Sequence, residues 1–378
     1  MIAQRKPLIS EVSEIKAIEP FEQPSEQFSL KRLLTPQLKD RIAAGRTLES
    51  GGLGIEPISA PVPAPAKPVG KVSKRQALEP VVSVSEDIVA QQSLEDTSAA
   101  FPSLKGVLKS SRRSFFPIFN QILGTSGDDD ITATEQPDYV NGFGGNDTIR
   151  GDNGDDILVG AAGDDVISGD HVPSRTYQSN DIIAGGSGND LLFGRIGKDL
   201  LIGGSGDDQI FGGSGSDRIN GGSGDDQIFG GIVAGDQSFN PDPDERDILV
   251  GGIGSDYIDG GEGNDVIVGS NWKAAGAGEL DLLTGGAGND IFVLGTRYGA
   301  HYIQGGASQD FAIILDFEQG DRVRLHGDAS QYVLAYDATE NATALGYLGG
   351  GGFELVGVFA DADLSDMSLT SSAFQYVS

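Results

Sequence analysis

The stretch GGSGNDLLFGRIGKDLLIGGSGDDQIFGGSGSDRINGGSGDDQIF, residues 185–229, contains five nine-residue units in tandem. Each unit has the form Gly-x-x-Gly-x-Asp-x-apolar-x. The same unit recurs on both sides of this stretch, and twelve intact copies begin at Gly124, Gly142, Gly151, Gly160, Gly185, Gly194, Gly203, Gly212, Gly221, Gly251, Gly260 and Gly285. A period held over so many copies predicts a repeat architecture in which each unit packs against its neighbours.

Two positions of the unit keep their chemistry in all twelve copies. The eighth is always apolar, as in Leu192, Ile210 and Phe292. The sixth is always aspartate, at Asp129, Asp147, Asp156, Asp165, Asp190, Asp199, Asp208, Asp217, Asp226, Asp256, Asp265 and Asp290. One position therefore supplies a core, and the other supplies a row of carboxylates.

The longer intervals between intact copies keep the register. Residues 133–141 form one degenerate copy of nine. Residues 169–184 and 269–284 each hold a copy with a seven-residue insert, and residues 230–250 hold one with a twelve-residue insert. Every insert comes before the aspartate, and the unit then resumes at Asp181, Asp247 and Asp281. Inserts confined to the turn half of a unit are expected of loops on a solenoid.

The two halves of the unit predict a turn and a strand. Glycine allows positive φ angles and close backbone approach, so the first six residues suit a turn. The last three residues form a short strand whose middle side chain points inward. Two units complete one coil, and parallel strands stack about 4.8 Å apart. We predict an all-β fold, a parallel β-roll in which two sheets enclose a narrow core of Ile, Leu and Val.

The stacked carboxylates of such a roll require a cation between them. Two carboxylates about 5 Å apart repel each other by about 0.8 kcal/mol even at the dielectric constant of water. The chain has no cysteine, and its three histidines, His171, His301 and His326, do not follow the period. Only carboxylate and backbone carbonyl oxygens recur, and such hard ligands favour Ca²⁺, with Mg²⁺ as the alternative. We predict that several calcium ions bind the roll.

The charge and composition of the chain exclude several classes of function. The chain carries 56 Asp and Glu against 26 Lys and Arg, a formal net charge of −30. We therefore expect no nucleic-acid partner, which would require a basic face. No apolar run approaches the about 18–20 residues of a membrane span. The sequence MIAQRKPLIS at the N-terminus lacks the apolar stretch of a secretory signal, so we expect no signal of that kind.

The repeat resembles that of the RTX (repeats-in-toxin) calcium-binding proteins. The copies GGSGNDLLF (185–193), GGSGDDQIF (203–211 and 221–229) and GGEGNDVIV (260–268) fit the RTX nonapeptide fully. The resemblance implies that each Ca²⁺ lies between the turns of copies n and n+2. It implies as ligands the carboxylates of the twelve sixth-position aspartates together with backbone carbonyls of the turns. Lys198 and Ser216 at the fifth position and Arg195 at the second depart from the pattern, and Lys198 places a cation beside Asp199. Weaker sites are therefore expected around Gly194 and Gly212.

The resemblance extends to the C-terminal region. The segment GGASQDFAIILDFEQGDRVRL (305–325) resembles the element that follows RTX repeats and closes the roll. Residues 354–378 look like a region that carries an uncleaved type I secretion signal. The implied partners are Ca²⁺ and the type I secretion machinery of a bacterium, and the implied location is extracellular.

These observations divide the chain into three parts. Residues 1–123 hold 12 of the 16 prolines, carry a net charge of +3, and are predicted to be a low-complexity, disordered segment. Residues 124–313 are predicted to form the RTX β-roll. Residues 314–378 are predicted to form a small β-rich cap that contains the secretion signal.

Two functions fit this organisation. The first is a noncatalytic, secreted calcium-binding protein with a structural, adhesive or surface role and a cell-surface or self-association partner. The second is the export or stability module of an RTX enzyme or toxin-like protein. We favour the first and predict no catalytic residues, because neither Gly-x-Ser-x-Gly nor His-Glu-x-x-His occurs.

One feature is not implied by the repeat itself. Phe193, Phe211 and Phe229 occupy the ninth position of copies that are 18 residues apart, so they are predicted to stack on one outward face. Such a row is either a packed ladder that stiffens the sheet or an exposed docking strip. We favour the packed ladder.

Overall fold

The computed structural model describes residues 119–170, 179–231, 246–270, 279–302, 310–348 and 354–378. The predictions for the N-terminal segment, up to residue 118, and for His171 lie outside the described residues. Within these ranges the chain consists of strands and turns, apart from one short 3-10 helix, η2 (Ala329–Gln331). No helix in the described ranges is long and apolar enough to cross a membrane.

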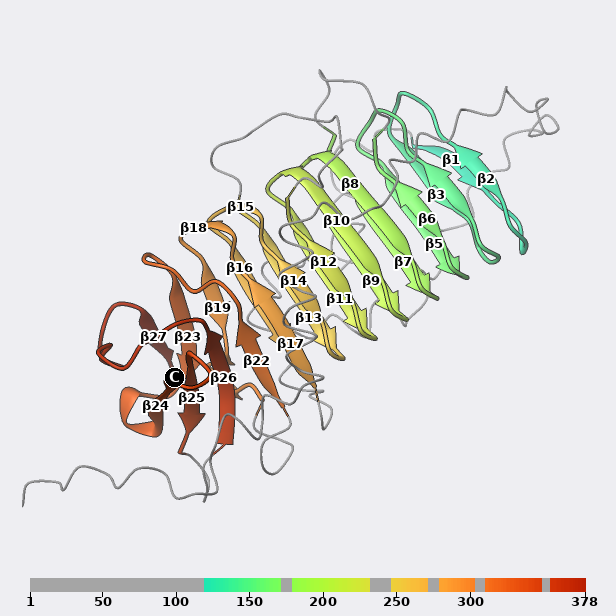
Figure 1. The fold of residues 1–378 in the computed structure, drawn as a ribbon. Helices are drawn as coiled ribbons and strands as arrows, with labels where there is room; N and C mark the ends of the chain where they lie inside the picture. The colour runs from blue at the N-terminus through green and yellow to red at the C-terminus, as the bar shows by residue number, and fades with distance from the viewer. Residues whose placement is uncertain (1–118, 171–178, 232–245, 271–278, 303–309, 349–353) are drawn as a thin grey trace, which may run out of the picture.

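Two large sheets take the strands of the repeat alternately. In the described part of the chain, the first sheet has the order β1 (Asn120–Leu123), β3 (Asp138–Asn141), β5 (Ile157–Ala162), β7 (Ile182–Ser187), β9 (Leu200–Ser205), β11 (Arg218–Ser223), β13 (Ile248–Ile253), β16 (Val266–Ser270), β19 (Ile291–Val293), β23 (Arg322–His326) and β27 (Phe374–Val377). The second has the order β2 (Asp130–Thr132), β4 (Thr148–Arg150), β6 (Val166–Ser168), β8 (Leu191–Gly197), β10 (Gln209–Gly215), β12 (Gln227–Phe229), β14 (Tyr257–Asp259), β17 (Leu280–Thr284), β22 (Phe311–Ile314), β26 (Glu354–Ala360), β25 (Ala342–Tyr347) and β24 (Tyr332–Asp337). The strands stack along one axis, with β1 and β2 at one end and β24 to β27 at the other (Figure 1).

The pairing register follows the nine-residue period. Ile210 pairs with Ile228 in parallel, 18 positions on, and the side chains of successive coils therefore lie directly above one another. Ile157 pairs with Ile182 and Arg218 with Ile248, so the inserts between them leave the strands in register. The predicted all-β parallel β-roll is confirmed.

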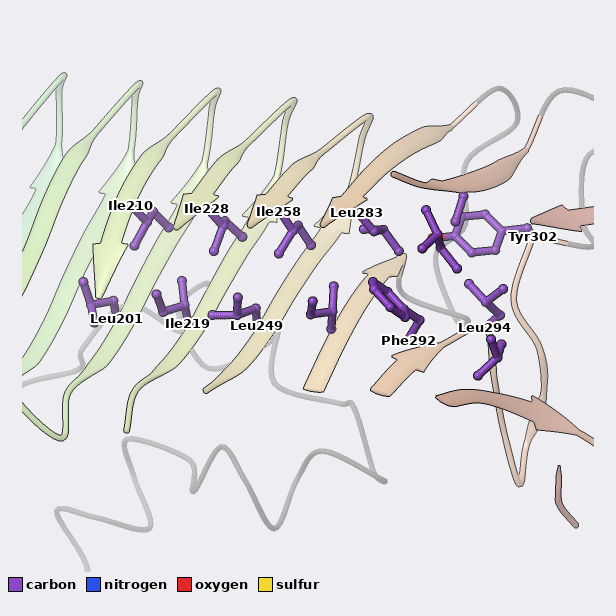
Figure 2. Close-up of a cluster of buried hydrophobic side chains, with 14 of the residues drawn as sticks. Leu201, Ile210, Ile219, Ile228, Leu249, Ile258, Leu283, Phe292, Leu294 and Tyr302 are labelled. Atoms are coloured by element: carbon purple, nitrogen blue, oxygen red, sulfur yellow. The ribbon is translucent and has the colours of Figure 1, made fainter. Parts of the chain in front are cut away.

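The core is the row of eighth-position side chains from each sheet. Figure 2 shows the two rows facing each other, with Leu201, Ile219 and Leu249 from the first sheet and Ile210, Ile228 and Ile258 from the second. All six of these side chains are fully buried. One apolar side chain per unit fills the space between the sheets, so the core is long but only two residues thick.

The outward aromatic row is also as predicted. The ring centroids of Phe193 and Phe211 lie 5.2 Å apart, and those of Phe211 and Phe229 lie 5.0 Å apart, in both cases stacked. The row continues to Tyr257 at 5.6 Å. These phenylalanines are only 3–8% exposed, so the row forms a packed ladder and is not an open strip.

The C-terminal residues continue both sheets and then close the second one. Strand β22 pairs in parallel with β17 and with β26, whereas β24, β25 and β26 pair antiparallel. Two short pairs lie beside the roll, β15 (Glu262–Gly263) with β18 (Ala287–Gly288), and β20 (Gly295–Thr296) with β21 (Gly299–Ala300). In the two large sheets, parallel pairing therefore continues beyond the last intact nonapeptide, and only the described pairs among β24, β25 and β26 depart from it.

At some fourth-position glycines, successive coils approach too closely to leave room for a side chain. Gly206 has φ of +120°, and a Cβ there would lie within 3.0 Å of the carbonyl oxygen of Gly188 one coil earlier. We expect Gly206→Ala to destabilise the fold by about 1–3 kcal/mol, because it forces a strained backbone and separates two coils. Thermal unfolding in calcium measures this effect.

Gly127 provides the matched control. It occupies the same position in the first unit, where a Cβ would meet nothing within 4 Å. Gly127→Ala should therefore leave the unfolding midpoint unchanged, and equal effects of the two substitutions would contradict the close-approach argument.

Candidate metal centre

Two ladders of aspartates run along the edges of the roll, one at the turns before each sheet. In the described residues, the first ladder contains Asp129, Asp147, Asp165, Asp190, Asp208, Asp226, Asp256 and Asp281. The second contains Asp138, Asp156, Asp181, Asp199, Asp217, Asp247, Asp265, Asp290 and Asp321. At each step the backbone N–H of one aspartate donates to Oδ1 of the aspartate one coil further on, at 2.8–3.0 Å.

The ladder hydrogen bonds use only one oxygen of each carboxylate. In the described structure the second oxygen is buried and has no hydrogen-bond partner in Asp147, Asp156, Asp165, Asp181, Asp190, Asp199, Asp208, Asp226, Asp256 and Asp290, where this atom is Oδ2. These side chains are at most 2% exposed. A buried carboxylate oxygen without a donor is costly, so its position calls for a ligand that the described chain does not supply.

The partnerless oxygens face a small space beside the first glycine of each unit. A Cβ added at Gly194 would lie 2.6 Å from Oδ2 of Asp199 and 2.6 Å from the carbonyl oxygen of Gly212, one coil further on. The same two kinds of oxygen frame Gly203, where they come from Asp208 and Gly221. The absence of a side chain on this glycine therefore leaves a cradle lined by oxygens from two successive coils.

Burial also disfavours the charged form of these carboxyl groups. It raises the pKa of Asp156 and of Asp208 to about 8, and that of Asp181 to about 9. The ladder hydrogen bonds oppose this rise in pKa, and repulsion from nearby aspartates adds to it. A cation in the cradle would reverse the effect of burial, because it favours the anionic form.

The donor set fits a hard cation. Among the described residues no three His, Cys, Asp or Glu side chains converge on one point. Each site would therefore combine the carboxylate Oδ2 with backbone carbonyls such as that of Gly212. Calcium accepts such mixed oxygen sets in flexible geometry, whereas magnesium requires a near-ideal octahedron and retains its waters.

The structure places all twelve predicted aspartates in the two ladders. It adds Asp138, Asp181, Asp247, Asp281 and Asp321, which the template of intact copies had left out. Four of these follow an insert or lie in the degenerate copy, so the glycines before them do not fit the template. The signal that finds them is an aspartate directly before a short apolar strand in the right register.

A second, exposed row accompanies the first ladder at the fifth position of the unit. The backbone N–H of Asn146 donates to Oδ1 of Asp128, and that of Asp164 to Oδ1 of Asn146. The pattern continues through Asn189 and Asp207. These bonds run in the opposite direction to those of the buried ladder, and sequence reasoning did not anticipate them. Short Asp or Asn side chains at the fifth position were the available signal.

The geometry therefore defines a parallel β-roll with oxygen-lined cradles along both edges. The family model for the RTX calcium-binding nonapeptide repeat matches the chain at residues 123–158, 150–171, 176–210, 202–232, 244–271 and 275–296. No curated protein matches the chain. The roll is therefore built of RTX calcium-binding nonapeptide repeats and is a calcium-binding roll.

The raised pKa values predict that acid partly replaces calcium. In the unfolded chain an aspartate has a pKa near 3.8, whereas in the calcium-free roll that of Asp208 is about 8. The calcium-free roll therefore binds protons more tightly than the unfolded chain does, and its stability should increase as the pH falls from 8 to 5.5. Circular dichroism in chelator should show β content increasing over this range.

The triple variant Asp156→Asn, Asp181→Asn, Asp208→Asn serves as the control. It keeps the Oδ1 acceptors but removes three of the strongly shifted groups, so its pH dependence in chelator should be smaller. A wild-type chain whose β content in chelator is the same at both pH values would contradict the prediction.

Proposed function

We propose that this chain is a secreted, noncatalytic protein whose roll folds when calcium fills the aspartate ladders outside the cell. The observation that carries the proposal is the row of buried carboxylate oxygens without hydrogen-bond partners, such as Oδ2 of Asp147, Asp190 and Asp226. An arrangement that buries this many acidic groups without donors is consistent only with a bound cation or with protonation.

Calcium would act as the switch between an exportable chain and a folded one. Where free calcium is scarce, burial and mutual repulsion oppose the ladder, as between Asp199 and Asp217. Where calcium is abundant, binding to the folded form alone stabilises it, by about 2.7 kcal/mol for each site when calcium is at 100 times its Kd. Many weak sites therefore suffice to make folding depend on calcium.

The proposed calcium ligands are the sixth-position aspartates with their turn carbonyls. The proposal covers the twelve aspartates predicted from the repeat and extends to Asp181 and Asp247, which occupy equivalent ladder positions. Calcium is proposed in preference to magnesium because backbone carbonyls make up much of the cradle.

The proposed role is structural, adhesive or surface-related, with a cell-surface component or a second copy of the chain as partner. The stacked sheets form an extended rod (Figure 1) whose interior is filled by apolar side chains. Export by a type I secretion system, with the signal in residues 314–378, is proposed from the resemblance of that region to RTX proteins.

Calcium dependence of folding is the direct test. In chelator at pH 8 the full chain should lack most of the β signal that it shows by circular dichroism in 5–10 times the half-saturating calcium concentration. Magnesium at the same concentration should restore much less of it. Equal β content in chelator and in calcium would refute the proposal.

The export route is tested by truncation. When the chain is co-expressed with a bacterial type I exporter, removal of residues 314–378 should abolish its appearance in the medium. Removal of residues 1–118, which leaves all described strands, should not. Unchanged export without residues 314–378 would place the signal elsewhere.

A further inference from the structure

The end turns of the two ladders differ from the interior turns. In the interior, Oδ2 of residues such as Asp147 and Asp256 has no hydrogen-bond partner. In the first and last turns of each ladder, the chain itself supplies a donor to the same oxygen. These donors come from Thr125, Thr134, Tyr302 and Glu318.

The last turn of the first ladder shows most clearly how the chain supplies a hydrogen-bond donor to the carboxylate oxygen. The hydroxyl of Tyr302 donates to Oδ2 of Asp281 at 2.5 Å, and Tyr302 is 2% exposed. A Cβ added at Gly269 would meet Oδ2 of Asp281 and the Tyr302 hydroxyl. At the preceding turn, a Cβ added at Gly251 would meet Oδ2 of Asp256 and the carbonyl oxygen of Gly269.

The Tyr302 hydroxyl thus lies in the cradle of its turn. In other turns, a glycine carbonyl of the next coil occupies that side of the cradle. The repeat is interrupted here, because Leu294 stands where the first glycine of the next unit would be and the β20–β21 pair follows it. Figure 2 shows Tyr302 at the end of the core rows, beyond Leu283. An ion at this turn would lack the carbonyl that the next coil provides, whereas a hydroxyl satisfies the carboxylate with one hydrogen bond.

The first turn of each ladder has a threonine at the second position of the unit that donates to Oδ2 of the aspartate. Thr125 donates to Oδ2 of Asp129 from its backbone N at 2.6 Å and from Oγ1 at 2.9 Å. Thr134 makes the same pair of bonds to Oδ2 of Asp138, at 2.6 and 2.7 Å. Oδ1 of Asp138, however, is buried and has no hydrogen-bond partner among the described residues, so of these two turns only that of Asp129 is closed. The last turn of the second ladder is closed by the backbone N–H of Glu318, which donates to Oδ2 of Asp321 at 2.7 Å.

We propose that the turns of Asp129, Asp281 and Asp321 hold no calcium, and that the protein's own donors end the rows of ions at these turns. The inference rests on the proposed function, because it assumes that the interior turns bind calcium. It divides the twelve aspartates of the repeat: Asp129 is a capped end residue, whereas those of the interior turns are ligands. It also makes these three turns independent of the ion.

The test compares neighbouring aspartates of one ladder in the full-length protein. Asp256→Asn should lower the number of calcium ions bound at saturation by one per chain, and Asp281→Asn should leave that number unchanged. Equilibrium dialysis followed by elemental analysis measures both counts. Equal counts for Asp256→Asn and Asp281→Asn would overturn the proposal.

The other end of the ladder gives an independent comparison if Asp281→Asn fails to fold. Asp147→Asn should lose one ion and Asp129→Asn none, and equal losses would again overturn the proposal. A wild-type chain that binds no calcium at all would instead refute the proposed function, so the two failures are distinguishable.

The variant Tyr302→Phe tests whether the Tyr302 hydroxyl takes the place of a calcium ion at this turn or binds one as a ligand. Tyr302→Phe should keep the wild-type number of ions but lower the midpoint of thermal unfolding in calcium, because Oδ2 of Asp281 loses its donor. Loss of an ion in Tyr302→Phe would identify the hydroxyl as a calcium ligand and overturn the proposal.

Discussion

The structure depends on one repeated hydrogen bond, from the backbone N–H of an aspartate to Oδ1 of the aspartate one coil further on. The bond links each turn to the next, and it holds the carboxylate in a fixed orientation. Its second consequence is that Oδ2 is directed into the turn, as at Asp208, where no described donor reaches it. The contact that stacks the coils thereby creates the demand for a cation.

The glycines at the first and fourth positions of the unit also serve coil stacking and ion coordination. At the fourth position, Gly206 lets the backbones of successive coils approach more closely than any Cβ would allow. At the first position, Gly194 leaves open the space that the oxygens of Asp199 and Gly212 surround. Coil spacing and ion coordination are therefore not separable properties of this roll. The thin core, with one apolar side chain per unit, is consistent with a fold that relies on both.

Much of this arrangement was predictable because the period is short and local. The turn, the inward Ile or Leu and the outward Phe193, Phe211 and Phe229 each follow from a position within nine residues, and the structure confirms them. Asp181 and Asp247 were harder to assign as ligands, because an insert separates each from the first glycine of its unit and no glycine stands two residues before it. Strand register brings these residues into the ladder regardless of the length of the loop.

The amino-acid sequence by itself determined the parallel β-roll, the two rows of carboxylates and the hard-oxygen chemistry, because identical units impose identical local environments. Only the tertiary structure decided which carboxylate oxygen remains without a donor and where each ladder ends. Tyr302 reaches Asp281 from 21 positions along the chain and belongs to no repeat. A contact between a periodic and a non-periodic segment depends on how the chain closes in space, and spacing alone does not encode it.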